Sequence, residues 1–113
     1  MRELPKSQKK IARELINTGL KRECKKFMEG IQKFLQKSDI DLENSHGLYL
    51  NIYKKVDKFD NHIARRYNDM TGSKYFDTVL GLYFDKILTE KDIELFDEEV
   101  QKELTRHIEI LSS

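Results

Sequence analysis

Apolar residues recur at intervals of three and four along most of this chain, a pattern typical of amphipathic helices. When each residue is placed 100° after the one before it, the apolar positions of residues 19–36 gather within an arc of about 120°. These positions are Leu20, Cys24, Phe27, Met28, Ile31, Phe34 and Leu35. The segment is therefore predicted to form a helix with one core-facing stripe.

The preceding residues 7–18 are also periodic, but their apolar positions point elsewhere. Ile11, Ala12, Leu15 and Ile16 centre about 130° away from the later stripe. Either Asn17-Thr18-Gly19 breaks or bends the segment, because glycine is a poor helix former. Or residues 7–36 form one continuous helix whose first three turns pack on something else, which would imply a partner.

Two more helices are predicted in the middle of the chain. Residues 46–70 carry one apolar face, and Thr71-Gly72 is expected to end that helix, with glycine in the left-handed position. Residues 74–88 are apolar over more than half of the helix circumference, which predicts a helix buried at the centre of the core.

A last helix is predicted over residues 89–111. Thr89 and Asp92 have the spacing of a capping box, which would start this helix. Short connections favour antiparallel neighbours, so the predicted fold is all-α, an antiparallel bundle of four to five helices. Residues 1–113 are predicted to form a single domain, with residues 1–18 either part of it or a separate basic helical arm.

Charge is unevenly distributed, although the whole chain has a formal net charge of +1. Residues 1–37 contain 11 Lys and Arg against 4 Asp and Glu, whereas residues 89–113 contain 3 against 8. This asymmetry indicates either a basic arm for an acidic partner or two chain ends that neutralise each other.

The most prominent cluster of polar groups lies on the predicted second helix. Six residues fall within about 120° of arc beside its apolar face and define a basic stripe: Lys54, Lys55, Lys58, His62, Arg65 and Arg66. The stripe is interpreted as a solvated or ion-paired face set against the acidic last helix, with a docking surface for phosphate-bearing or acidic partners as the alternative. Catalysis by His62 is disfavoured, because only Asp69 shares its face as an orienting group.

No motif of known chemistry is found, so no catalytic residue, cofactor or metal ligand is predicted, and the chain is interpreted as a non-enzyme. The glycines stand far apart, and neither His62 nor His107 has glutamate three residues before it, as di-iron bundles require. The only cysteine, Cys24, is expected to be a small buried residue and favours a reducing, cytoplasmic location. No apolar run is long enough to cross a membrane.

The sequence resembles no family that we can name. The leading hypothesis is a small cytoplasmic helical-bundle protein that acts through protein–protein contacts as a regulatory or accessory protein, and that self-associates into a homo-oligomer. The alternative is an anion- or nucleic-acid-binding module that uses the basic faces of the first two helices. A pI near 7.8 is lower than that of a typical DNA-binding domain, so nucleic-acid binding ranks below the leading hypothesis.

Overall fold

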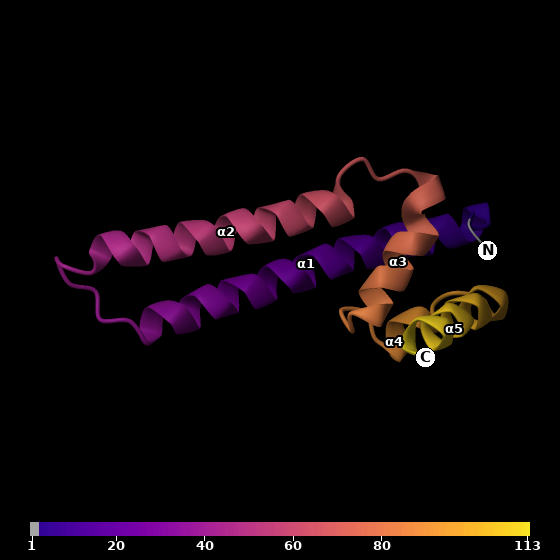
Figure 1. Ribbon diagram of the computed structural model, residues 1–113. Helices are drawn as coiled ribbons and strands as arrows, with labels where there is room; N and C mark the ends of the chain where they lie inside the picture. Colours follow the sequence, from indigo (N-terminus) through magenta and orange to yellow (C-terminus); the bar gives the residue numbers. More distant parts are fainter. Residues whose placement is uncertain (1–2) are drawn as a thin grey trace. The chain divides into compact units, whose positions relative to one another are not determined.

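The predicted all-α class is confirmed by a computed structural model that describes residues 3–113. These residues form five α-helices and one 3₁₀ helix, and none of them lies in a β-strand (Figure 1). The elements in chain order are α1 (Lys6–Gln36), α2 (Ser45–Tyr67), η1 (Gly72–Lys74), α3 (Tyr75–Phe84), α4 (Glu90–Ile93) and α5 (Glu98–Ser112).

The chain divides into two compact units. One unit comprises the residues up to Arg22 together with Asp69–Ser113, and the other comprises Glu23–Asn68. Helix α1 contributes its first turns to the first unit and its later turns to the second. The assignment of residues 1–113 to a single domain stays a prediction.

Helix α1 is continuous, so Asn17-Thr18-Gly19 does not break it. The apolar residues of its first turns are buried inside the first unit: Ala12, Leu15 and Ile16. The change in direction of the apolar stripe is therefore explained within the chain. These turns face the core of the first unit, and their burial requires no partner.

Gly19 is a close-packing position in this continuous helix. A Cβ atom added there would lie 2.8 Å from Cδ1 of Leu82, a fully buried side chain of α3. Glycine thus lets α1 and α3 approach each other closely, at the expense of about 1 kcal/mol of helix propensity. Gly30, in the same helix, has no atom within 4 Å of an added Cβ.

We expect Gly19→Ala and Gly30→Ala to change stability in opposite directions. Gly30→Ala should raise the free energy of unfolding by roughly 0.5–1 kcal/mol, because only helix propensity changes. Gly19→Ala should lower it by about 1 kcal/mol, because overpacking of about 1–3 kcal/mol exceeds the same gain. Urea unfolding of both variants measures the difference, and equal stabilisation by both would contradict the close contact with Leu82.

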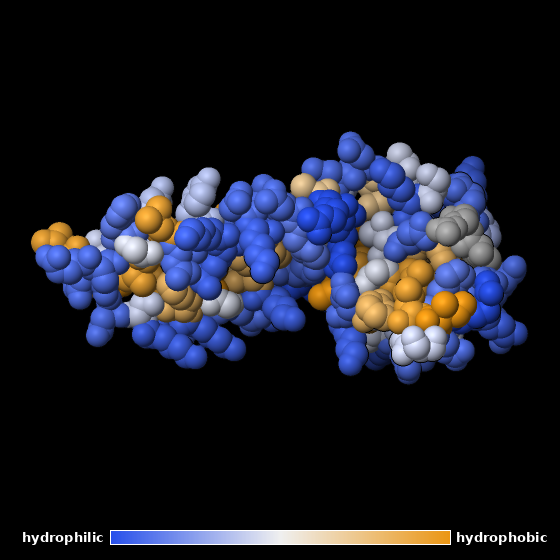
Figure 2. Space-filling model, in the orientation of Figure 1, coloured by the Kyte–Doolittle hydropathy of each residue, from blue (hydrophilic) through white to orange (hydrophobic). Residues whose placement is uncertain are grey.

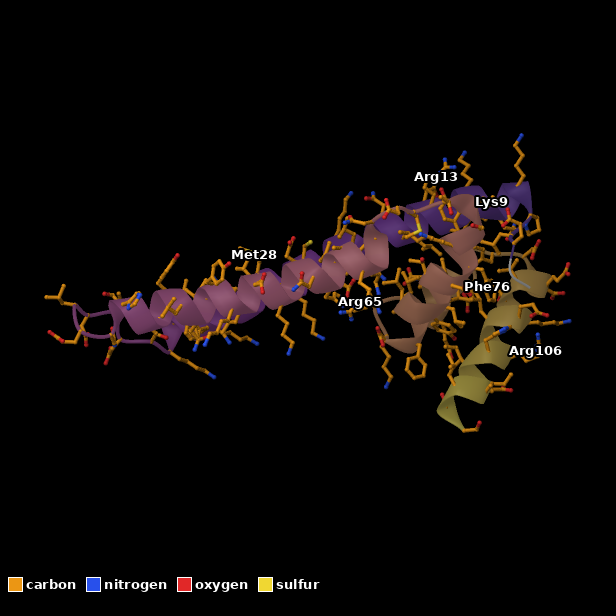
Figure 3. All side chains as sticks on the ribbon, turned by 45° about the horizontal axis from the view of Figure 1, so that its top comes forward. Lys9, Arg13, Met28, Arg65, Phe76 and Arg106 are labelled. Atoms are coloured by element: carbon orange, nitrogen blue, oxygen red, sulfur yellow. The ribbon has the colours of Figure 1, made fainter. Side chains whose placement is uncertain are left out.

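Helix α3 lies in the core of the first unit, but it ends at Phe84 and not at residue 88 as predicted, and its burial is confined to one side because Phe84 is 45% exposed. Phe76, Val79 and Leu82 are buried, and α3 packs against α5, where Val100 and Leu104 are buried. Figure 3 shows Phe76 between these two helices. Its ring meets the ring of His107 edge-on at a centroid distance of 5.3 Å.

The expected boundary between the second and third helices is wrong in detail. Helix α2 ends at Tyr67, and the left-handed residue that follows it is Asp69, with φ of 56°. Gly72 instead begins the 3₁₀ turn η1. An aspartate tolerates the left-handed region better than most residues, so the helix can stop before the glycine.

The single last helix predicted over residues 89–111 is also wrong, because two helices occupy this segment. The Thr89–Asp92 capping box is present and starts the short α4. Asp97 then starts α5 by accepting a hydrogen bond from the amide of Val100 at 3.1 Å. The amide of Asp97 donates to the Oε1 atom of the buried Gln8 at 2.9 Å, which anchors this turn to α1.

Asp92 also joins α4 to α1 within the first unit. The guanidinium of Arg22 donates to both carboxylate oxygens of Asp92, at 2.7 and 3.3 Å. These hydrogen bonds hold the pKa of Asp92 at about 2, and the capping bonds from Thr89 act in the same direction. Asp92 therefore stays ionised and links α1 to the start of α4.

Candidate functional site: the two faces of a helical hairpin

The second unit is a helical hairpin made of the later turns of α1 and the whole of α2 (Figure 1). Its contacts run antiparallel: Phe34 meets Lys55, Phe27 meets Phe59, and Glu23 meets Arg66. Half-buried apolar residues mark the seam between the helices, namely Cys24, Phe27, Ile31 and Phe34 of α1 and Ile52, Phe59 and Ile63 of α2. Cys24 was expected to be a small buried residue, but in the seam it is only partly covered.

A buried carboxylate closes one end of the seam. Glu23, whose side chain is only 9% exposed, accepts hydrogen bonds from three residues of α2. The Oε1 atom lies 2.8 Å from Nε2 of His62 and 3.0 Å from Nη1 of Arg66. The hydroxyl of Tyr67 donates to Oε2 at 2.5 Å. Glu23 is thus the ionic clamp that holds α2 against α1.

The clamp shifts the pKa values of its own members. Burial alone would raise the pKa of Glu23, but hydrogen bonds from Tyr67 and His62 and the charge of Arg66 outweigh burial, so the pKa lies below its ordinary value. Burial and the hydrogen bond to Glu23 raise the pKa of Tyr67 far above its ordinary value. At neutral pH the clamp therefore contains an ionised carboxylate and a protonated phenol.

The clamp divides the predicted basic stripe into two parts. His62 and Arg66 both hydrogen-bond to Glu23, so the carboxylate that faces this part of the stripe comes from α1. Lys54, Lys58 and Arg65 are exposed, and Lys55 lies with its Nζ atom 5.0 Å from the ring centroid of Phe34. The assignment of the stripe as a binding site stays a prediction.

A groove of about 480 Å³ runs along the face of the hairpin that carries His62. Its floor is the stacked pair Phe27 and Phe59, whose ring centroids are 4.2 Å apart, together with Ile31. The remaining lining residues form its rim: Gly30, Lys55, Lys58 and His62. An apolar floor with a cationic rim can bind a group that is both apolar and acidic.

The other face of the hairpin is apolar and open to solvent. At 100° per residue, Met28 lies about 60° to one side of Ile31 and Gly30 about 100° to the other. In α2, Val56 lies about 60° to one side of Phe59 and His62 about 60° to the other. Because the groove unites Gly30 with His62, Met28 and Val56 share the opposite face.

Five exposed residues define this apolar face: Met28, Leu35, Tyr49, Tyr53 and Val56. Met28 and Tyr49 are each 61% exposed, which is unusual for side chains of this size beside a helix seam. Figure 2 shows apolar side chains at the surface along the hairpin, and Figure 3 shows Met28 and Arg65 on opposite sides of it.

The next candidate for a functional side chain is His107, the histidine of α5. His107 lies 2.8 Å from the backbone carbonyl of Glu103 and 3.9 Å from its carboxylate, a local contact within α5. No three potential metal-binding side chains among residues 3–113 come together. None of the helices in that range is both long and apolar enough to cross a membrane.

Comparison of the chain with models of known protein families, with curated protein sequences and with solved structures gives no match. The function must therefore be argued from the two faces of the hairpin. Sequence reasoning identified the cations of one face, but it missed the clamp at Glu23 and the groove beside Phe27. The sequence does contain a signal for Glu23, because it lies directly before Cys24 and four residues before Phe27. It therefore borders the apolar stripe that forms the seam.

Proposed function

We propose that this protein acts through protein–protein contacts and self-associates, with its helical hairpin pairing with the hairpin of a second copy. The observation that carries the proposal is that α2, a helix of 23 residues, contains no buried residue. An amphipathic helix is stable when its apolar stripe is covered by another element. Two hairpins that join through their apolar faces form a four-helix bundle and provide that cover.

The charges beside the apolar face favour one arrangement of the two copies. On the α1 edge of this face lies Lys25, whose side chain is 77% exposed and whose Nζ atom lies 3.8 Å from the carboxylate of Glu29. On the α2 edge lies the exposed Asp60. If α1 of one copy lies against α2 of the other, these edges meet with opposite charges. If like helices meet, lysine faces lysine and aspartate faces aspartate, which is unfavourable.

We expect the native chain to have twice its monomer mass of 13.5 kDa in light scattering coupled to size-exclusion chromatography. Tyr53→Glu and Val56→Glu should each shift the mass to that of one chain, because each places a charge in the apolar interface. The matched control is Asn61→Glu, an exposed substitution on the same helix but away from both faces. It should leave the dimer intact.

A native chain that stays monomeric up to about 1 mM would refute self-association, because specific dimers have dissociation constants well below that concentration. Equal weakening by Asn61→Glu would also refute it, since the effect would then come from net charge. The fold of each variant can be checked by circular dichroism. Substitution of these exposed side chains should leave helix content unchanged.

A second candidate is an anion- or nucleic-acid-binding module that uses the basic stripe. It is supported by the exposure of Lys54, Lys58 and Arg65, whose spacing of four and seven residues puts them on one line of α2. The cytoplasm is the proposed compartment, and it rests on the single, unpaired Cys24.

A further inference from the structure

We propose that the groove beside His62 binds an acidic amphipathic helix of a partner protein. The groove lies on the face opposite the proposed dimer interface, so this inference does not depend on self-association. It rests on three features of the hairpin: the length and openness of the groove, the gap left by Gly30, and the lysines that border the groove.

The size of the groove fits a helix of about two turns. It extends along α2 from Lys55 to His62, which are seven positions apart, or roughly 10 Å along the helix axis. It is also open to solvent along its length. Small-molecule sites bury about 70–90% of their ligand, which an open groove does not do, whereas a helix needs only one of its faces covered.

Gly30 gives the partner access to the floor of the groove. An added Cβ at this position would meet nothing within 4 Å, so the α1 side of the groove has free space here. A larger residue there would narrow the groove that Gly30 lines together with Phe27 and Phe59. With glycine, an apolar side chain of the partner can reach those rings from above.

Charge on this face has one sign. Lys55 and Lys58 form the α2 rim, and Lys26 lies exposed one turn before Gly30 on α1. The nearby carboxylate, Glu23, is buried and already pairs with His62 and Arg66. A partner helix with acidic residues beside its apolar positions would match these lysines on both sides.

The test is fluorescence anisotropy with the full chain and a labelled helical peptide of about four turns. The peptide has leucines at positions i, i+3, i+4 and i+7 and glutamates beside them. We expect saturable binding of this peptide. Its scrambled isomer, and an analogue with lysine in place of each glutamate, should bind at least tenfold more weakly.

Variants of the groove separate this site from general charge attraction. Gly30→Leu should weaken binding at least tenfold while the fold is retained, because the added side chain enters open space and favours helix. Lys55→Glu and Lys58→Glu should each weaken it about threefold to tenfold. The control is Lys54→Glu, which removes an exposed cation of the same stripe outside the groove and should have little effect.

Three results would overturn the proposal. The first is no peptide binding up to about 1 mM, and the second is equal binding of the scrambled isomer. The third is tighter binding of a labelled single-stranded oligonucleotide, weakened by Lys54→Glu as much as by Lys58→Glu and unaffected by Gly30→Leu. That result would assign the basic stripe to phosphate binding. Light scattering of Val56→Glu tests self-association separately, so failure of one proposal leaves the other standing.

Discussion

Glu23→Ala is expected to destabilise the hairpin by about 3–5 kcal/mol, the typical effect of removing one partner from a buried ionic cluster. The substitution removes the acceptor of three hydrogen bonds and leaves Arg66 and Tyr67 half-buried beside an apolar seam. Amide hydrogen exchange should show the loss of protection in α2, which has no buried side chain of its own.

The matched control for this substitution is Glu29→Ala on the same helix. The side chain of Glu29 is 56% exposed, and its carboxylate lies 3.8 Å from Nζ of Lys25, so its removal should change the free energy of unfolding by less than about 0.5 kcal/mol. Comparable losses in the two variants would show that Glu23 does not clamp the hairpin.

The pH dependence of unfolding provides a second measurement of the same clamp. The pKa of Glu23 in the folded chain lies below its ordinary value of 4.5, so the unfolded chain takes up this proton more readily. The stabilisation is therefore fully present above pH 4.5 and is lost as the pH falls through the folded pKa. The difference in stability between the native chain and Glu23→Ala should shrink over that range.

The helical class could be predicted because apolar periodicity is a local property of the sequence. The direction of the early α1 stripe corresponds to real burial in the first unit, and so does one side of residues 74–88, whereas Phe84 on the other side is exposed. The helix ends could not be placed as well. The turn between α4 and α5 is anchored by a hydrogen bond from the amide of Asp97 to the side chain of Gln8. These two residues are 89 positions apart in the sequence. No pattern within residues 89–111 reveals that bond.

The candidate site was predictable only in part, for a similar reason. The angular placement of Lys55, Lys58 and His62 on one side of α2 follows from the sequence alone. The stacking of Phe27 on Phe59 and the pairing of His62 with Glu23 depend on the register between two helices. Helical periodicity defines a face, but it does not say which residue of another helix lies opposite.

The two faces of the hairpin also explain why its charges are arranged as they are. Lysines surround the groove, whereas Asp60 lies on the side of the apolar face. An acidic helix would be attracted to the lysines that surround the groove. In the proposed assembly, a second copy would occupy the apolar face without competing for the groove on the opposite face.

The stability of the first unit should depend strongly on Phe76 and weakly on Phe84, although both are phenylalanines of the same short helix. Phe76 is 1% exposed and packs between α3 and α5, whereas Phe84 is 45% exposed. We expect Phe76→Ala to lower the free energy of unfolding by about 3–5 kcal/mol, because it removes a buried ring and leaves a cavity. Phe84→Ala should lower it by less than about 1 kcal/mol.

Urea unfolding followed by circular dichroism measures both variants, and the contrast between them tests the orientation of α3. If α3 were rotated so that Phe84 faced α5, the order of the two losses would be reversed. The ring of His107 supplies an independent signal, since it contacts Phe76 edge-on. Its proton resonances should shift in Phe76→Ala and remain unchanged in Phe84→Ala, because an aromatic ring at this distance shifts the resonances of its neighbour.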